Sequence, residues 1–167
     1  MRALTERDIR TSFVNCSKGE AQRLSLPRDL DQRPWEDLDF LGWRDHTAHE
    51  RAYLVTERGD RLVGVAFRLS NARVGLRRSV CSVCLTTHPG RGVALLAAPK
   101  ARRAGQDGST VGLYMCTDFA CSLYIRGKKQ PEPGGRFEES LTVDEQIARA
   151  STNLGGFLDR LSALTST

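Results

Sequence analysis

Apolar residues near the start of the chain recur at the spacing of an α-helix. Ile9 and Phe13 are four residues apart, so both would lie on one face. Thr5 can cap a helix that follows it, and Asp8 suits the first turn, where backbone N–H groups favour negative charge. The pattern predicts a helix over residues 6–15.

A second short helix is predicted within residues 19–26. Pro27 would end it, because the residue before a proline is pushed out of the α region. Residues 27–37 then have the composition of a linker. We therefore expect a short N-terminal helical segment with its linker (1–34), followed by the main domain (35–167).

The central part of the chain predicts two β-hairpins. Residues 51–56 and 61–69 are strand-like and are joined by Glu-Arg-Gly-Asp, a typical hairpin turn. Residues 93–98 and 110–115 form a second strand-like pair, separated by a polar, basic segment that contains glycine. These pairs predict antiparallel sheet structure in the middle of the domain.

The C-terminal region predicts one amphipathic helix over about residues 143–164. Thr142 and Glu145 have the spacing of a capping box. The apolar positions alternate at spacings of three and four residues: Ile147, Ala150, Leu154, Phe157, Leu161 and Leu164. This stripe favours a core-facing helix, and a helix that binds a partner or forms a coiled-coil seam is the alternative.

Length and composition allow one compact domain with a short appendage. The chain has 167 residues, of which 40% are hydrophobic and 27% charged. It contains no apolar run of about 18 residues, and its first residues are charged where a signal peptide would be apolar. These features predict a cytoplasmic protein that does not bind a membrane.

Four of the five cysteines form two close pairs. Cys81 and Cys84 have C-x2-C spacing, Cys116 and Cys121 have C-x4-C spacing, and Cys16 stands apart. In a reducing compartment, paired cysteines favour metal over disulfides, and zinc prefers four tetrahedral sulfur or nitrogen ligands. The pairs predict a zinc site, and buried unligated cysteines or redox chemistry are the alternatives.

The order of elements around these cysteines predicts a treble clef. The first pair fits a tight knuckle, the second hairpin follows, and the second pair would lie where the last strand turns into a helix near Thr117 or Asp118. We therefore expect an α+β fold, with the treble clef at about residues 78–130. His88 could compete as a ligand or flank the site, although Pro89 and Gly90 indicate an exposed turn.

Four cysteine ligands would close the zinc coordination sphere, whereas a catalytic zinc keeps an open position. No common catalytic motif occurs, so we expect no catalytic residues, no small-molecule substrate and a structural Zn²⁺. His46 and His49 are expected in a solvated loop. The acidic cluster of Glu36, Asp37 and Asp39 is expected at a solvated edge. The aromatic residues Trp35, Trp43 and Tyr53 are expected in the core rather than on a base-stacking surface.

Positive charge is concentrated in the cysteine-bearing segment. Residues 73–136 hold 11 of the 25 Lys and Arg residues but three of the 20 Asp and Glu residues. Such a surface attracts nucleic acid or an acidic protein face, although it can also serve solubility alone. In a nucleic-acid-binding module, the phosphate contacts would come from Arg73, Arg77, Arg78, Lys100, Arg102 and Arg103.

Two sequence segments carry a resemblance to a known family. VCSVC, followed by a hairpin and then by YMCTDFACSLYIRG, resembles the C-terminal treble-clef zinc finger of the elongation factor G-binding proteins, the FusB-type fusidic acid resistance proteins. DLDFLGWRD and GDRLVGVAFRL are also similar to that domain. The resemblance covers about residues 35–160, whereas the resistance proteins carry a larger N-terminal helical bundle.

This resemblance implies a non-enzymatic protein that binds elongation factor G and helps to free it from the ribosome. By position, Cys81, Cys84, Cys116 and Cys121 become the zinc ligands. We expect the partner surface among exposed basic and aromatic residues near the zinc site, namely Arg102, Arg103, Phe119, Tyr124, Arg126, Lys128 and Lys129. A basic zinc-finger module that binds RNA or DNA is the alternative function.

Overall fold

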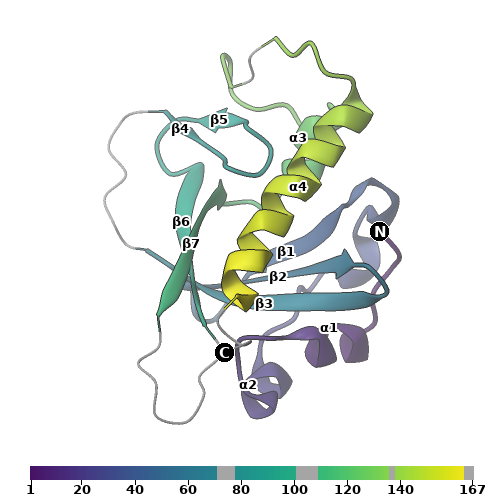
Figure 1. Ribbon diagram of the computed structural model, residues 1–167, viewed down its shortest axis with the longest axis vertical. Helices are drawn as coiled ribbons and strands as arrows, with labels where there is room; N and C mark the ends of the chain where they lie inside the picture. Colours follow the sequence, from purple (N-terminus) through teal and green to yellow (C-terminus); the bar gives the residue numbers. More distant parts are fainter. Residues whose placement is uncertain (71–77, 101–108, 136–137, 164–167) are drawn as a thin grey trace.

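The computed structural model describes residues 1–70, 78–100, 109–135 and 138–163 (Figure 1). Within these residues, five strands form an antiparallel sheet in the order β1-β2-β3-β6-β7. A separate two-stranded sheet pairs β4 with β5. The strands span Phe40–Arg44, Arg51–Arg58, Arg61–Leu69, Ser79–Val80, Thr87–His88, Val93–Pro99 and Thr110–Cys116. The α+β prediction is confirmed.

The N-terminal region forms two short capped helices. α1 (Glu6–Ser12) has a capping box between Thr5 and Asp8, as predicted, and α2 (Lys18–Arg23) follows. α1 is shorter than the predicted 6–15 because the chain becomes extended at Phe13, and the N–H of Val14 donates to the carbonyl of Gly64 in β3. Pairing with the sheet therefore ends the helix.

The linker and the hairpins follow the prediction closely. Residues 27–37 contain two single 3₁₀ turns, Leu30–Gln32 and Trp35–Asp37. β2 and β3 form the first hairpin, and Gly59 has a φ of 58° in its turn, where glycine carries no Cβ penalty. β6 and β7 form the second hairpin, although part of their connection lies outside the described residues.

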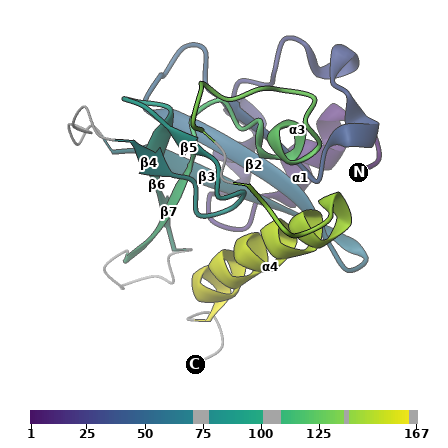
Figure 2. The ribbon, with the colours of Figure 1, turned by 90° about the horizontal axis from the view of Figure 1, so that it is seen from above.

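One face of the sheet packs against α4 (Val143–Ser162), which crosses it diagonally (Figures 1 and 2). Leu54, Val65 and Phe67 of the strands share this core with Leu154 and Phe157 of the helix. The predicted core-facing stripe is thus confirmed, whereas predicted position 164 lies outside the described residues. The zinc region belongs to the same core.

The opposite face of the sheet packs against the N-terminal helices. Leu41, Trp43 and Tyr53 form a second core with Ile9 of α1 and Leu24. Trp43 and Tyr53 are buried and Trp35 is partly buried, so the prediction that these aromatic residues pack in a core is confirmed. The sheet is therefore the middle of three layers, and the separation at 34/35 remains a prediction about domain organisation.

In the described parts of the chain, no helix has both the length and the apolar character that crossing a bilayer requires.

Candidate metal centre

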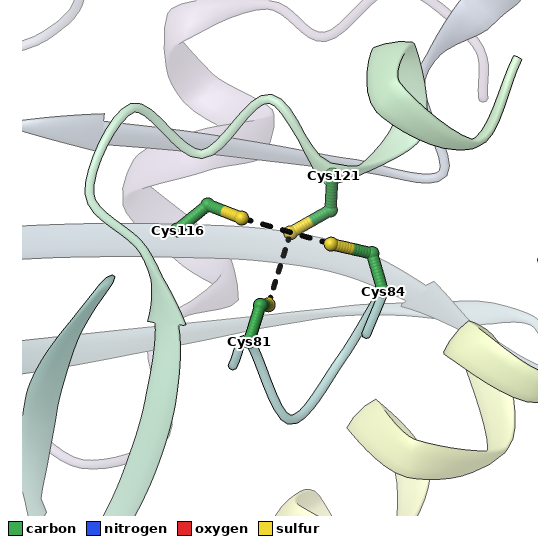
Figure 3. Close-up of side chains that lie close together, drawn as sticks. All are labelled: Cys81, Cys84, Cys116 and Cys121. Carbon is green, nitrogen blue, oxygen red and sulfur yellow. Dashed lines mark hydrogen bonds between the residues drawn. The ribbon is translucent and has the colours of Figure 1, made fainter. Parts of the chain in front are cut away.

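Four cysteines converge at the end of the second hairpin (Figure 3). Cys81 and Cys84 lie in the knuckle between β4 and β5, Cys116 ends β7, and Cys121 begins α3 (Cys121–Ile125). The Sγ atoms of Cys81 and Cys121 are 3.6 Å apart, as are those of Cys84 and Cys116. All four Sγ atoms lie within 4.8 Å of one another.

This geometry fits a tetrahedral zinc ion. A zinc–sulfur distance of about 2.3 Å places neighbouring sulfur atoms about 3.8 Å apart, which is close to the distances found here. All four side chains are at most 2% exposed. The four cysteines thus fill the tetrahedral coordination sphere with soft ligands and leave no open position for a substrate, as a structural Zn²⁺ site requires.

The knuckle is held by backbone hydrogen bonds. The N–H of Cys81 donates to the carbonyl of Thr86 over 2.9 Å, and the N–H of Ser82 donates to the carbonyl of Tyr114 in β7 over 2.8 Å. Leu85 has a φ of 60°, a left-handed conformation that side chains other than glycine rarely adopt. The N–H of Leu85 donates to the carbonyl of Cys81 over 3.0 Å, so this residue closes the turn that holds the first cysteine pair.

Polar groups contact the sulfur atoms of the knuckle. The backbone N–H of Val83 donates to Cys81 Sγ over 3.4 Å, and the Cys84 thiol donates to Thr86 Oγ1 over 3.3 Å. Hydrogen bonds, first of all from Cys116, hold the pKa of Cys81 and Cys84 below its ordinary value, whereas the hydrogen bond with Cys116, before those with the other cysteines, raises the pKa of Cys121. Zinc binds the thiolate form, so binding releases the protons that the four thiols still hold.

The helix that carries the second pair begins later than predicted. α3 starts at Cys121, not near Thr117 or Asp118. Asp118 uses its carboxylate to accept the N–H of Ala120 over 3.0 Å, and Phe119 has a φ of 57°, so helical geometry cannot start before Ala120. Cys116 and Cys121 are thereby separated by a fixed turn.

Two contacts fix that turn. Phe119 lies against Gly42 of β1, where an added Cβ would come within 2.4 Å of the Phe119 ring. Asp118 also accepts hydrogen bonds from Tyr124 Oη over 2.7 Å and from Lys129 Nζ over 2.9 Å. The spacing of the second cysteine pair is thus set by the sheet and by α3 together.

His88 lies at the metal centre, which corrects the expectation of an exposed turn. It is 7% exposed, and its Nε2 is 3.3 Å from Cys116 Sγ. Its ring packs beside Tyr124, at 5.0 Å between centroids. Gly92 leaves the required space, because a Cβ there would lie 2.3 Å from that of His88. His88 is placed to support a thiolate ligand through hydrogen bonding.

We predict that His88→Ala weakens zinc binding by about tenfold to a hundredfold without abolishing it, because a ligand would lose its hydrogen-bond partner. Competition with a chromophoric chelator measures the affinity. His46→Ala is the control, since His46 is exposed and belongs to the β1–β2 connection. Equal zinc affinity in both variants would contradict the assigned role.

The predicted partner residues have different environments. Phe119 and Tyr124 are only 5% and 4% exposed, so the expectation that they are exposed is wrong. They pack into the core around the zinc site because the turn between the ligands folds inward. Arg102 and Arg103 lie outside the described residues.

The remaining basic residues of the set form ion pairs. Arg126 pairs with Asp39 at 2.7 Å, and Lys128 pairs with Asp37 at 2.8 Å. The acidic cluster is therefore no purely solvated edge: Asp37 and Asp39 attach the residues before β1 to the segment after α3. Lys129 remains about half exposed although it contacts Asp118.

The phosphate-contacting set of the nucleic-acid alternative is described only in part. Arg73, Arg77 and the two arginines of the second-hairpin connection fall outside the described residues. Arg78 is exposed and donates to the carbonyl of Pro133, and Lys100 is half-buried. These positions form no described cluster. His46 and His49 are exposed, as predicted.

The family can be assigned by comparison with known proteins. The model of the FBP C-terminal treble-clef zinc-finger, the FusB-type domain, matches residues 8–161. The chain belongs to this family. The match begins well before the expected residue 35 and so includes most of α1 and all of α2. None of the curated proteins matches the chain. The FBP family is not a known family of enzymes, and its assignment confirms the zinc-finger prediction.

In this FBP-family chain, sequence reasoning identified the four metal-centre cysteines and named His88 beside them, but missed Thr86 and Asp118. Thr86 follows the C-x2-C pair at a short distance, a spacing that could have marked it as a neighbour of the sulfur atoms. Asp118 lies two residues before Ala120, a typical arrangement for an Asp side chain that caps a turn.

Proposed function

We propose that this zinc-binding protein of the fusidic acid resistance type is a non-enzymatic protein that binds elongation factor G and promotes its release from the ribosome. Membership of the FBP zinc-finger family carries the proposal. The metal centre supports it, because four buried cysteines close the coordination sphere and leave zinc no position for a substrate. In this proposal, zinc keeps a binding surface rigid.

Exposed side chains beside the knuckle suit a protein partner. Tyr114 is 53% exposed, and its backbone is tied to the knuckle through Ser82. Val80 and Leu85, on either side of the first cysteine pair, are also exposed. Tyrosine is enriched among residues that dominate binding energies. We propose these three side chains, together with Lys128 and Lys129 of the partner surface predicted from the sequence, as the contact surface for the factor.

The test is saturable binding of the zinc-loaded protein to purified elongation factor G, followed over a salt series and compared with RNA alone. We predict that Tyr114→Ala weakens factor binding by about tenfold or more, the range of an interface anchor. Val143→Ala is the matched control, since Val143 is exposed at the start of α4. If the protein does not bind elongation factor G saturably, the proposed function is contradicted. If the two variants bind the factor equally well, the proposed contact surface is contradicted.

A further inference from the structure

A second candidate binding site lies away from the metal centre. It is a pocket of about 380 Å³ lined by α2, the strands β2 and β3, and the end of β6 at Pro99. The metal centre lies at the other end of the second hairpin, because Val93 pairs with Cys116 whereas Pro99 pairs with Thr110. The two sites are therefore separated by the length of β6.

Three arginines line this pocket. Arg51 of β2 and Arg68 of β3 are directly opposite each other in the antiparallel register, and Arg23 reaches the same pocket from α2. All three are exposed. Like charges placed directly opposite across two strands destabilise a sheet. An anion bound between the two guanidinium groups would offset this repulsion.

The acidic residues of the pocket are engaged in hydrogen bonds within their own segments. Asp45 accepts hydrogen bonds from the N–H groups of Thr47 and Ala48 and from the hydroxyl of Tyr53. Its carboxylate is thus used in holding its own loop.

Glu20 caps α2 in the same way, accepting the N–H and hydroxyl of Ser17. The hydrogen bonds from Ser17 lower the pKa of Glu20 most, and the nearby positive charges of Arg23 and Arg51 lower it further. Among the described residues, Arg68 and Arg23 form no ion pair, and the ion pair of Arg51 with Glu50 is long, at 3.9 Å. Arg51 also interacts with the hydroxyl of Tyr53.

We propose that Arg23, Arg51 and Arg68 form a binding site for the phosphate groups of RNA. Guanidinium groups match phosphate oxygens through paired N–H donors, and several of them on one surface suit a chain of phosphates better than a single carboxylate. Lys100 directly follows Pro99, the pocket residue at the end of β6, in the chain. The site goes beyond the proposed factor binding and uses a different surface.

The test measures the fluorescence anisotropy of a labelled single-stranded RNA oligonucleotide with the zinc-loaded full chain over a salt series. The double variant Arg51→Ala/Arg68→Ala is expected to bind about tenfold more weakly, and its salt slope is expected to fall by about 1.4, the effect of two lost phosphate contacts. Arg7→Ala/Arg61→Ala is the control, because it removes the same charge from exposed positions outside the pocket.

A single variant separates binding from folding. Arg68→Glu places opposite charges across β2 and β3, so its melting temperature should stay equal or rise while RNA binding is lost. Equal weakening in the pocket and control variants would overturn the site in favour of general electrostatic attraction. Loss of binding to elongation factor G but not to RNA would overturn it in favour of an acidic protein partner. If the pocket variants bind elongation factor G as tightly as the unsubstituted protein does, the proposed function is unaffected.

Discussion

Replacing Cys84 by serine is expected to release zinc and to unfold the half of the protein that contains α4. A serine hydroxyl is a poor zinc ligand, and structural zinc contributes about 10–16 kcal/mol of apparent binding free energy in isolated finger peptides. The four cysteines belong to the same core as Phe67 and Phe157, so the loss cannot stay local. Metal content by mass spectrometry and thermal unfolding by circular dichroism measure both effects.

Cys16→Ser is the matched control for this prediction. Cys16 is half-buried and lies on the N-terminal side of the sheet, among the residues that pack against the second core. It should keep one zinc ion per chain and a nearly unchanged melting temperature. If Cys84→Ser also kept its metal and its melting temperature, the zinc site would not be structural.

Phe157→Ala is expected to reduce the free energy of unfolding by about 3–5 kcal/mol, the usual range for removing a buried aromatic side chain. Phe157 is fully buried and stacks on Phe67, with 5.6 Å between ring centroids. Chemical denaturation of the zinc-loaded protein measures the change. Thr152→Ala, at an exposed position of the same helix, should alter stability by less than about 0.5 kcal/mol. A similar loss in both variants would mean that α4 is not held by this contact.

Features encoded by neighbouring residues were predictable from the sequence. The capping box of Thr142 and Glu145, the Gly59 turn and the spacing of the two cysteine pairs each depend on residues within one turn or one hairpin. Their local geometry admits few alternatives, so the helix, the hairpin and the ligand set could be identified without the fold.

Features that join distant segments were not predictable. Arg126 and Asp39 are 87 residues apart in the chain, and no local pattern indicates that they meet. His88 had the neighbours of an exposed turn, and its burial depends on the space left at Gly92 and on the ring of Tyr124. The burial of Phe119 likewise depends on its contact with Gly42 of β1. In each case, a side chain is buried by a segment that sequence spacing does not place beside it.

The burial of the metal ligands has a consequence for metal exchange. Cys81, Cys116 and Cys121 are fully buried and Cys84 nearly so, which limits the access of a chelator to the sulfur atoms in the folded state. We expect zinc to leave after the knuckle separates from β7, which breaks the hydrogen bond between Ser82 and Tyr114. The rate of zinc loss is then the rate of this opening and does not depend on the chelator concentration. The chain is then expected to release zinc slowly, so a chelator competition reports the affinity only after exchange has reached equilibrium.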